Sequence, residues 1–394
     1  MRPEVYLIAL GAFALGMASY VTAGLIPMIE TAFLVPPAIA AQLVTAFTLA
    51  YGLGSPVLVA LMPAQRQRDA LLIALAGFVL ANAASAMATD FTLLLVFRAL
   101  AGIGAGVYLA LGIAASAALS GAELRGKAIA VIMGGMASGT VLGVPLSLIL
   151  TERMGWASAL WLVAGLGMVA LIGLALRLPA LPVAASVSLR RKLALLGDRH
   201  VMLILLVSLL AAIASLGMYT FIAPLLREPA FGGITSITPY LWIWGVGGVL
   251  GSFLIGPVVD RVRGPLLTLW IMVILAAALF LLPVTAGISP WLAVIPIAVW
   301  GAVGWALQVP QNNELLRARS HEGDGNLAVA LNESALYLGS AIGAGMGGLL
   351  LLQHWPVGTL AVAAGVIAAV GTVAQLLNLR ENTQSSADAG ADPR

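Results

Sequence analysis

The chain has 394 residues, of which 61% are hydrophobic and only 9% are charged, and its mean hydropathy is +1.05. Soluble domains carry roughly 25% charged residues, so a soluble fold of this composition would expose large apolar patches. The net charge of +3 does not indicate nucleic-acid binding, because the basic residues lie singly or in short groups between apolar runs. The sequence has no cysteine, and its three histidines lie too far apart for a metal-ligand motif. The composition therefore predicts an all-α integral membrane protein.

Apolar runs long enough to cross a membrane follow one another along the whole chain. A helix needs about 20 mostly apolar residues to cross the hydrocarbon of a bilayer. We expect twelve transmembrane helices, at 5–26, 40–62, 70–88, 91–118, 126–150, 156–178, 200–225, 236–259, 265–284, 290–315, 326–351 and 356–379. The first run is expected to be an uncleaved span rather than a signal peptide. The short polar gap at 88–90 predicts a tight hairpin between the third and fourth spans.

The expected helices divide into two sets of six, separated by one long basic loop. The sequence predicts an N-terminal half at 1–178, a cytoplasmic linker at 179–199, a C-terminal half at 200–380 and a disordered cytoplasmic tail at 381–394. The halves also resemble each other, because Gly54-Ser55 and Gly251-Ser252 each end a span before a polar loop, at an offset of 197 residues. Parallel six-helix repeats are a known transporter architecture, with the binding site near the midplane between them.

Lysine and arginine are distributed very unequally between the two sides of the predicted bundle. If the N-terminus is cytoplasmic, that side carries 16 of the 19 basic residues, and the other side carries only Arg153 and Arg227. The remaining one, Arg98, lies within a span. The positive-inside rule therefore predicts that both termini are cytoplasmic. We expect a multi-pass protein of the cytoplasmic (inner) membrane that is surrounded by the lipid bilayer and acts as a monomer.

Four short motifs resemble those of the major facilitator superfamily. They are GSFLIGPVVDRVRG at 251–264, close to the family's loop motif, RALAGIGAG at 98–106, close to its fourth-span motif, GGMASGTVLGVP at 134–145, close to its fifth-span antiporter motif, and YTFIAPL at 219–225, similar to a seventh-span pattern. More narrowly, the chain resembles the bacterial twelve-helix drug:proton antiporter and sugar-efflux branch. The resemblance implies two pseudo-symmetric halves, alternating access, a small-molecule substrate, and the proton gradient as energy source with no cofactor.

Asp260 and Arg261 lie at the cytoplasmic end of the eighth expected span. An acid there can face the N-terminus of a neighbouring helix, where the macrodipole favours negative charge by about 0.3–1 kcal/mol. The resemblance implies that this contact latches one conformation, and the alternative is a loop acid that simply pairs with Arg261. The first half departs from the pattern, because the position 197 residues before Asp260 is Pro63. We expect any latch in the first half to be weaker or different.

Arg98 is predicted to lie roughly seven residues, or about 10 Å, into the fourth span. An arginine at mid-helix costs at least about 2.5–3.5 kcal/mol on insertion scales, so it needs a compensating role. We interpret Arg98 as a charge that controls a neighbouring proton site or holds an anionic substrate. The alternative is an arginine that snorkels outward and anchors the helix.

Glu333 is the candidate proton carrier, roughly two turns into the eleventh span. A carboxylate there would be partly desolvated, which disfavours its charged form and allows it to bind and release a proton in each cycle. The alternative is a solvated, passive glutamate near the cytoplasmic mouth. A direct pair with Arg98 is not expected, because the axial gap is about 10 Å. The resemblance implies an acid in the first span, where this chain has Ser19, so proton coupling depends on Glu333 almost alone.

Small residues in two spans are predicted to form packing surfaces. Gly139, Gly143 and Pro145 in the fifth span let helices approach closely and bend. The same spacing of small residues recurs in the eleventh span, at Gly339, Gly343 and Gly347. We expect both surfaces to be those on which the two halves rock, and ordinary tight packing is the alternative.

Polar and aromatic residues of both halves are predicted to line the substrate cavity. The candidates are Tyr20, Thr45, Tyr51, Tyr108, Tyr219, Trp244, Trp305, Gln308 and Asn332. Their character suits a neutral, amphipathic or weakly polar solute, and we expect its export in exchange for protons. An importer, facilitator or exchanger without proton coupling is the first alternative, and a non-transporting sensor is another. An enzyme would need a convergent acid/base or metal site, which the sequence does not indicate.

Overall fold

The computed structural model describes residues 2–61, 66–181, 197–259, 261–319 and 325–390, and this part of the chain consists of helices and loops. The N-terminal half contains α1 (Pro3–Phe33), α2 (Pro37–Ala40), α3 (Gln42–Leu49), the π-helix η1 (Ala50–Gly54), α4 (Ser55–Leu61), α5 (Gln67–Ala86), α6 (Phe91–Ser138), the π-helix η3 (Gly139–Gly143), α7 (Val144–Met154) and α8 (Ala157–Arg177). The C-terminal half contains α10 (Arg199–Arg227), the 3-10 turn η4 (Pro229–Phe231), α11 (Thr238–Val259), α12 (Gly264–Ile288), α13 (Val294–Ala306), α14 (Gln308–Ala318), α15 (Gly325–Leu352) and α16 (Gly358–Gly390).

Twelve segments have the length and composition of membrane spans. Eleven of them meet the length and hydropathy expected of a spanning helix within the described residues. The twelfth is α11, a 22-residue helix without a charged side chain at the position of the eighth expected span. Every expected span overlaps one of these segments. The chain is an all-α membrane protein of twelve transmembrane helices in two six-helix halves, as the sequence predicts.

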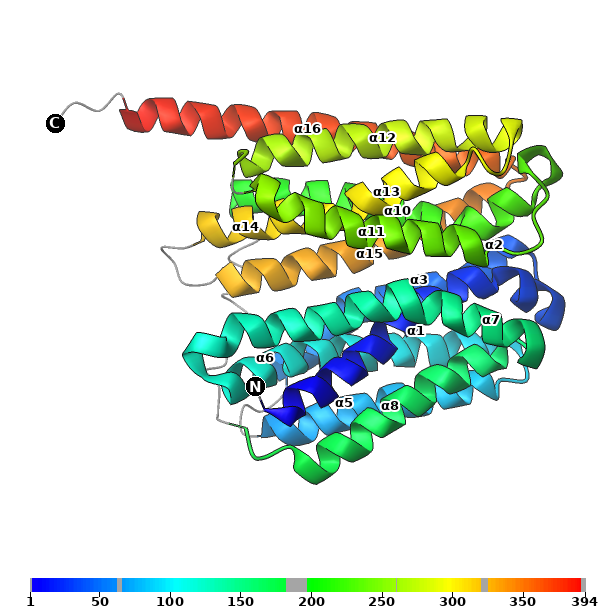
Figure 1. Cartoon of the computed structure of the whole chain (residues 1–394), viewed down its shortest axis with the longest axis horizontal. Helices are drawn as coiled ribbons and strands as arrows, with labels where there is room; N and C mark the ends of the chain where they lie inside the picture. The colour runs from blue at the N-terminus through cyan, green and yellow to red at the C-terminus, as the bar shows by residue number, and fades with distance from the viewer. Residues whose placement is uncertain (1, 62–65, 182–196, 260, 320–324, 391–394) are drawn as a thin grey trace.

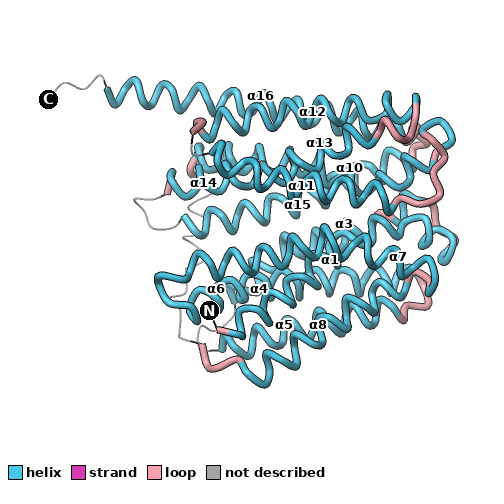
Figure 2. The backbone as a smooth tube through the Cα atoms, viewed as in Figure 1, coloured by secondary structure: helices cyan, strands magenta, loops and turns pink. Residues whose placement is uncertain are grey.

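The two halves lie side by side, with their helices running roughly along the long axis of the bundle (Figures 1 and 2). Both chain termini lie at the same end, which we call the terminal end, and the opposite end is called the far end (Figure 1). The halves meet along three lines: α1 against α10, α3 and η1 against α15, and η3 and α7 against α11. Near the middle of the bundle, the hydroxyl groups of Ser19 and Tyr337 lie 3.4 Å apart across this interface.

Local sequence explains where two of the long helices begin. Asp90 caps α6, because its carboxylate accepts a hydrogen bond of 2.9 Å from the backbone N–H of Leu93. Asp198 caps α10 in the same way, accepting from the N–H groups of His200 and Val201. Such caps satisfy backbone donors that have no partner inside the helix. The cap at Asp90 also confirms the tight turn predicted between the third and fourth spans.

The glycines of the fifth and eleventh spans pack within their own halves. A Cβ atom at Gly139 would overlap the backbone carbonyl of Phe13 in α1, and one at Gly343 would overlap that of Ile213 in α10. Pro145 is buried directly after the π-helix η3, in a helix that is continuous from α6 to α7, and its missing N–H removes one hydrogen bond from that helix. The expectation that these glycines form the surface between the halves is therefore not met. They bring α1 onto η3 and α10 onto α15 instead.

Two expected loops are helical in the structure. α16 continues through 381–390, where the sequence predicted a disordered tail, and α6 continues through 119–125, where the ribbon turns back at the terminal end (Figure 1). Neither stretch contains a proline, and extending an existing helix at 381–390 avoids the cost of nucleation. Most of the predicted linker, 182–196, lies outside the described residues.

Candidate functional site

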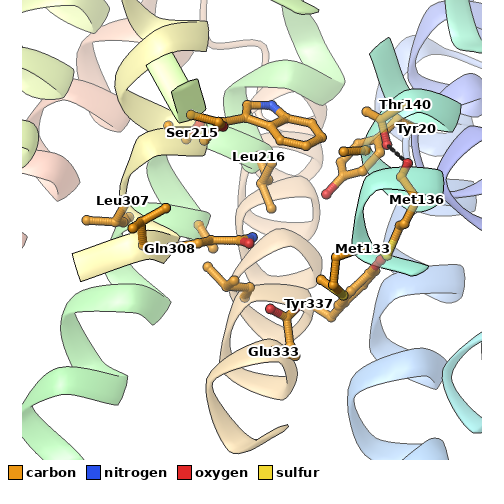
Figure 3. Close-up of a pocket in the computed structure, with 18 of the residues that line it drawn as sticks. Tyr20, Met133, Met136, Thr140, Ser215, Leu216, Leu307, Gln308, Glu333 and Tyr337 are labelled. Atoms are coloured by element: carbon orange, nitrogen blue, oxygen red, sulfur yellow. Dashed lines mark hydrogen bonds between the residues drawn. The ribbon is translucent and has the colours of Figure 1, made fainter. Parts of the chain in front are cut away.

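A cavity of about 290 Å³ lies between the two halves, from the middle of the bundle towards the terminal end. The N-terminal half contributes side chains from α1, α6 and η3, and the C-terminal half contributes side chains from α10 to α15. Figure 3 shows Tyr20, Met136 and Thr140 on one side of the cavity and Leu307 and Gln308 on the other. The site is therefore built from both repeats, as the sequence predicts.

Glu333 is the only acidic or basic side chain among the described residues that line this cavity. It lies about two turns after the start of α15. Its Oε1 atom is buried and has no hydrogen-bond partner among the described residues. A carboxylate oxygen that is buried without a partner is costly, so such a group takes up a proton or binds a donor or cation. The arrangement supplies one exchangeable proton site directly inside the cavity.

A chain of aromatic rings runs along the wall of the cavity and connects one half to the other. The ring of Tyr20 in α1 meets Tyr219 of α10 edge-on at 5.5 Å between centroids. Tyr219 in turn lies 4.5 Å from Trp244 of α11, and Trp244 lies 5.9 Å from Trp305 of α13. Aromatic pairs at these separations attract each other. Tyr20, Trp244 and Trp305 line the cavity directly, so a bound molecule would meet several aromatic faces.

Hydroxyl and amide groups add hydrogen-bonding capacity to the aromatic wall. Thr140 of η3 donates to the backbone carbonyls of Gly16 and Met136, at 3.2 and 3.3 Å. Ser215 of α10 accepts a 2.7 Å hydrogen bond from the indole N–H of Trp300. The side chain of Gln308 points into the cavity (Figure 3). The cavity can therefore orient a polar group on an otherwise apolar or aromatic molecule.

Five of the nine predicted cavity residues do not line this cavity. Tyr219 lies in the second layer behind Tyr20 and Trp244, and Tyr51 stacks on Tyr337 at 3.6 Å between ring centroids. Tyr51 and Tyr219 therefore support residues that do line the cavity. The other three lie on other faces of their helices.

Tyr108, Asn332 and Thr45 are these three. The Tyr108 hydroxyl donates to the carbonyl of Ile8 inside the N-terminal half, at 3.1 Å. The Asn332 amide donates to Asn312 of α14 at 2.8 Å. Thr45 lies on α3 near Gly345 of α15. A helix presents residues three or four apart on one face, so a polar residue in a span is as easily turned into the protein core as into the cavity.

Arg98 lies in the core of the N-terminal half and not in the cavity. Its side chain is fully buried, and its guanidinium donates to the backbone carbonyl of Ala18 at 2.7 Å and to the Asn82 amide oxygen at 3.3 Å. The guanidinium also lies 4.4 Å from the centre of the Phe47 ring. No carboxylate pairs with Arg98 among the described residues. The burial contradicts the alternative that Arg98 snorkels to the surface, and a direct pair with Glu333 is absent, as expected.

The predicted latch can be described only in part. Asp260 lies outside the described residues, and Arg261 is exposed in the turn that follows α11. The N–H of Arg261 donates to the carbonyl of Val258 at 3.0 Å, which continues the last turn of that helix.

Other buried polar residues were not singled out from the sequence. Glu314 of α14 is only 9% exposed, 3.5 Å from His200 of α10, and accepts a 3.1 Å hydrogen bond from Asn378 of α16. Only the packing of these three helices brings the groups together. Met136 and Thr140 were also missed as cavity residues, although a signal existed: they lie 197 residues before Glu333 and Tyr337, which line the same cavity.

Two six-helix repeats that enclose a central cavity define a class of membrane transporters. The sequence matches the Major Facilitator Superfamily over residues 8–323, and the chain belongs to this family. Members of the family are transporters, so the protein is a membrane transporter and not an enzyme.

The individual relatives agree with this assignment. The chain is 30% identical over 381 residues to the inner membrane transport protein YdhP of Escherichia coli O157:H7, and the aligned region covers 96% of each chain. It is 31% identical over 278 residues to a chloramphenicol resistance protein of Streptomyces lividans, covering 68% of this chain and 71% of the relative. Its fold resembles the crystal structure of a bacterial homolog to the human lysosomal transporter Spinster, with a TM-score of 0.74 at 17% identity, covering 96% of this chain and 98% of the other. A D-xylose-proton symporter gives a TM-score of 0.73 at 18% identity, covering 95% and 96%.

Proposed function

We propose that the protein exports a small amphipathic organic molecule across the bacterial inner membrane in exchange for protons, by alternating access. The observation that carries this proposal is the unpaired carboxyl of Glu333 inside an aromatic cavity between the two halves. The relatives support it, because one is an inner membrane transport protein and another is a chloramphenicol resistance protein. The distribution of basic residues supports an orientation in which the terminal end faces the cytoplasm and the far end faces outward.

The proposed cycle uses one proton site and one substrate site that exclude each other. Substrate enters the cavity from the cytoplasm and displaces the proton on Glu333, which leaves to the cytoplasm. The halves then rock, and the substrate leaves at the far end. Glu333 next takes a proton from outside, which neutralises the buried carboxylate and allows the empty carrier to return. One proton thus enters for each substrate molecule exported.

The lining of the cavity favours a particular kind of substrate. Aromatic rings and methionine side chains offer apolar contact, and Gln308, Ser215 and Thr140 offer a few hydrogen bonds. A volume of about 290 Å³ lies near the lower end of ordinary ligand pockets. A carboxyl group without a basic neighbour in the lining disfavours anions. We therefore propose a neutral or weakly basic molecule with an aromatic or apolar body.

Arg98 is proposed to act on proton coupling indirectly, by holding α1 in place. Its guanidinium is bonded to the carbonyl of Ala18, and the next residue, Ser19, lies 3.4 Å from the Tyr337 hydroxyl on the same helix as Glu333. The fixed charge thereby positions the helix that faces the proton site. Asp260 and Arg261 keep their proposed role as a conformational latch.

One observation favours a second candidate function, a facilitator or exchanger without proton coupling. The first-span acid implied by the family resemblance is replaced by Ser19, whose hydroxyl donates to the carbonyl of Leu15 at 2.9 Å. Proton coupling would then lack one of the acidic groups that the family resemblance implies. The two candidates differ in whether substrate binding releases a proton.

The test is proton release from purified protein on addition of substrate. The variants are wild type, Glu333→Gln and Glu228→Gln, which removes an exposed acid at the far end. The compounds are chloramphenicol, a sugar and a nucleoside. Release in wild type and Glu228→Gln, and its loss in Glu333→Gln, is the expected result. Binding without release in wild type would overturn the proton-exchange mechanism and favour the facilitator.

A further inference from the structure

An acid and a base at matching positions of the two repeats meet across the interface at the far end. Glu30 lies near the end of α1 and Arg227 at the end of α10, and their charged atoms are 4.0 Å apart. The two positions differ by 197 residues, the repeat offset. Each follows by three residues a proline inside its helix, Pro27 in α1 and Pro224 in α10.

The symmetry of the fold explains why these two residues face each other. When two repeats are related by a pseudo-twofold axis, a residue near the axis lies opposite its own counterpart. Identical charged residues at such a position would repel each other. Here one repeat carries glutamate and the other carries arginine, so the same geometry becomes attractive. The pair therefore holds α1 and α10 together at the far end.

A second polar contact closes the far end between another pair of helices. The Ser236 hydroxyl, in the segment before α11, donates to the Glu152 carboxylate near the end of α7, at 3.4 Å. Together the two contacts join α1 and α7, two of the N-terminal helices that border the interface, to the C-terminal half. The cavity with Glu333 lies on the other side of this closure, towards the terminal end.

The ion pair has the strength expected of a contact that breaks in every cycle. The side chains of Glu30 and Arg227 are 24% and 51% exposed, and exposed pairs of this kind shift an equilibrium by up to about fivefold. Both residues also line a cavity of about 570 Å³ at the far end, together with Phe231 and Trp355. Separation of the pair would remove the contact between α1 and α10 that borders this outer cavity.

We propose that Glu30 and Arg227 form the outer gate of the transporter, with Glu152 and Ser236 as its second contact. The gate stabilises the conformation that is closed at the far end, and its opening releases substrate there. The proposal rests on alternating access in the proposed function, but it requires neither proton coupling nor a known substrate.

The absence of cysteine from the chain permits a direct test. The reporter is Leu216→Cys, a cavity position, labelled with a membrane-impermeant maleimide in right-side-out and inside-out vesicles. Glu30→Gln and Arg227→Gln should each raise the labelling rate from the far side by about threefold to fivefold. The charge-exchanged double variant, Glu30→Arg with Arg227→Glu, should return the rate to within about twofold of the parent. Glu228→Gln removes a neighbouring charge that lines the same outer cavity but is not part of the ion pair, and it serves as the matched control.

The gate is overturned if Glu30→Gln is labelled from the far side at the same rate as Glu228→Gln. It is also overturned if the increase in labelling rate of the charge-exchanged double variant equals the sum of the increases of the two single variants. Labelling needs no substrate, so a negative result here leaves proton exchange untouched, and absent proton release leaves the gate untouched.

Discussion

The two halves of the transporter place their membrane-embedded charges in opposite ways. The N-terminal half buries Arg98 in its own core, bonded to Ala18 and Asn82, and the matching position in the other half is Ile295, which is 62% exposed on the outside of the bundle. The C-terminal half places Glu333 in the central cavity. The two repeats therefore share the same backbone fold but differ in where they place charged side chains.

The difference shows how one fold can divide two tasks between its repeats. A charge held by several fixed hydrogen bonds, such as Arg98, orders the helices around it and has no freedom to exchange protons with a cavity. A carboxyl without such partners, such as Glu333, can change its protonation state when the cavity fills or empties. The N-terminal half thus supplies a rigid frame, and the C-terminal half supplies the group that responds to substrate.

The largest effect should follow from replacing the charge in the cavity. Glu333→Gln removes the only acidic side chain of the described lining, and we expect proton-driven export to fall to the level of membranes without the protein. Met136→Gln alters the matching position on the other wall and should leave coupling in place. The export rate of inverted vesicles under an imposed proton gradient is measured for both variants. Equal losses of export in the two variants would contradict the view that only the C-terminal half supplies the proton-binding group.

Substitution of the glycines at the close helix contacts should lower the stability of the protein by similar amounts in both halves. Gly139→Ala and Gly343→Ala each force a methyl group into a neighbouring backbone carbonyl, and we expect each to lose about 1–3 kcal/mol of unfolding free energy. Gly165→Ala is the control, because no heavy atom lies within 4 Å of its added carbon. Thermal unfolding of the purified proteins compares them. If Gly139→Ala were as stable as Gly165→Ala, the close approach of α1 and η3 would be refuted.

The frame around Arg98 should affect stability more than coupling. Asn82→Leu removes one acceptor of a buried guanidinium, which should destabilise the protein by about 1–3 kcal/mol. Substrate-dependent proton release should persist, because Glu333 is unchanged. Unfolding and proton release measured on the same preparation decide this point. Loss of proton release without loss of unfolding free energy would show that Arg98 takes part in proton coupling and does not only stabilise the N-terminal half.

The smallest effect should come from a single hydrogen bond in the same core. Tyr108→Phe removes the donor to the Ile8 carbonyl and should cost about 0.5–1.5 kcal/mol of unfolding free energy. Substrate affinity, measured by calorimetry with a compound that binds the wild type, should not change. A clear loss of affinity would instead return Tyr108 to the cavity lining that its sequence position suggested.

Sequence patterns were sufficient for the helices but only partly for the site. All backbone groups in a bilayer must be bonded within the segment, so long apolar runs predict spans directly. Glu333, Tyr20 and Gln308 were also found, because polar and aromatic residues are conspicuous in such runs. The face to which each side chain turns depends on the packing of several helices, so the sequence predicts Tyr108 and Asn332 in the cavity although they lie elsewhere.

The repeat offset of 197 residues carries information about the site as well as about the loops. Applied to the whole chain, it pairs Glu333 with Met136 and Glu30 with Arg227 on the amino-acid sequence alone. The π-helical turns η1 and η3 have no such signal, because an extra residue in a helical turn leaves hydropathy unchanged.

The central claim is that a carboxyl group in the cavity, and not its particular repeat, couples protons to substrate. The most direct measurement is the number of protons released per bound ligand in Glu333→Met and in the double variant Met136→Glu with Glu333→Met. We expect no release from the single variant and restored release from the double variant, because the carboxyl has moved to the matching position of the same cavity. Undiminished release from Glu333→Met would contradict the claim and place the proton site elsewhere in the protein.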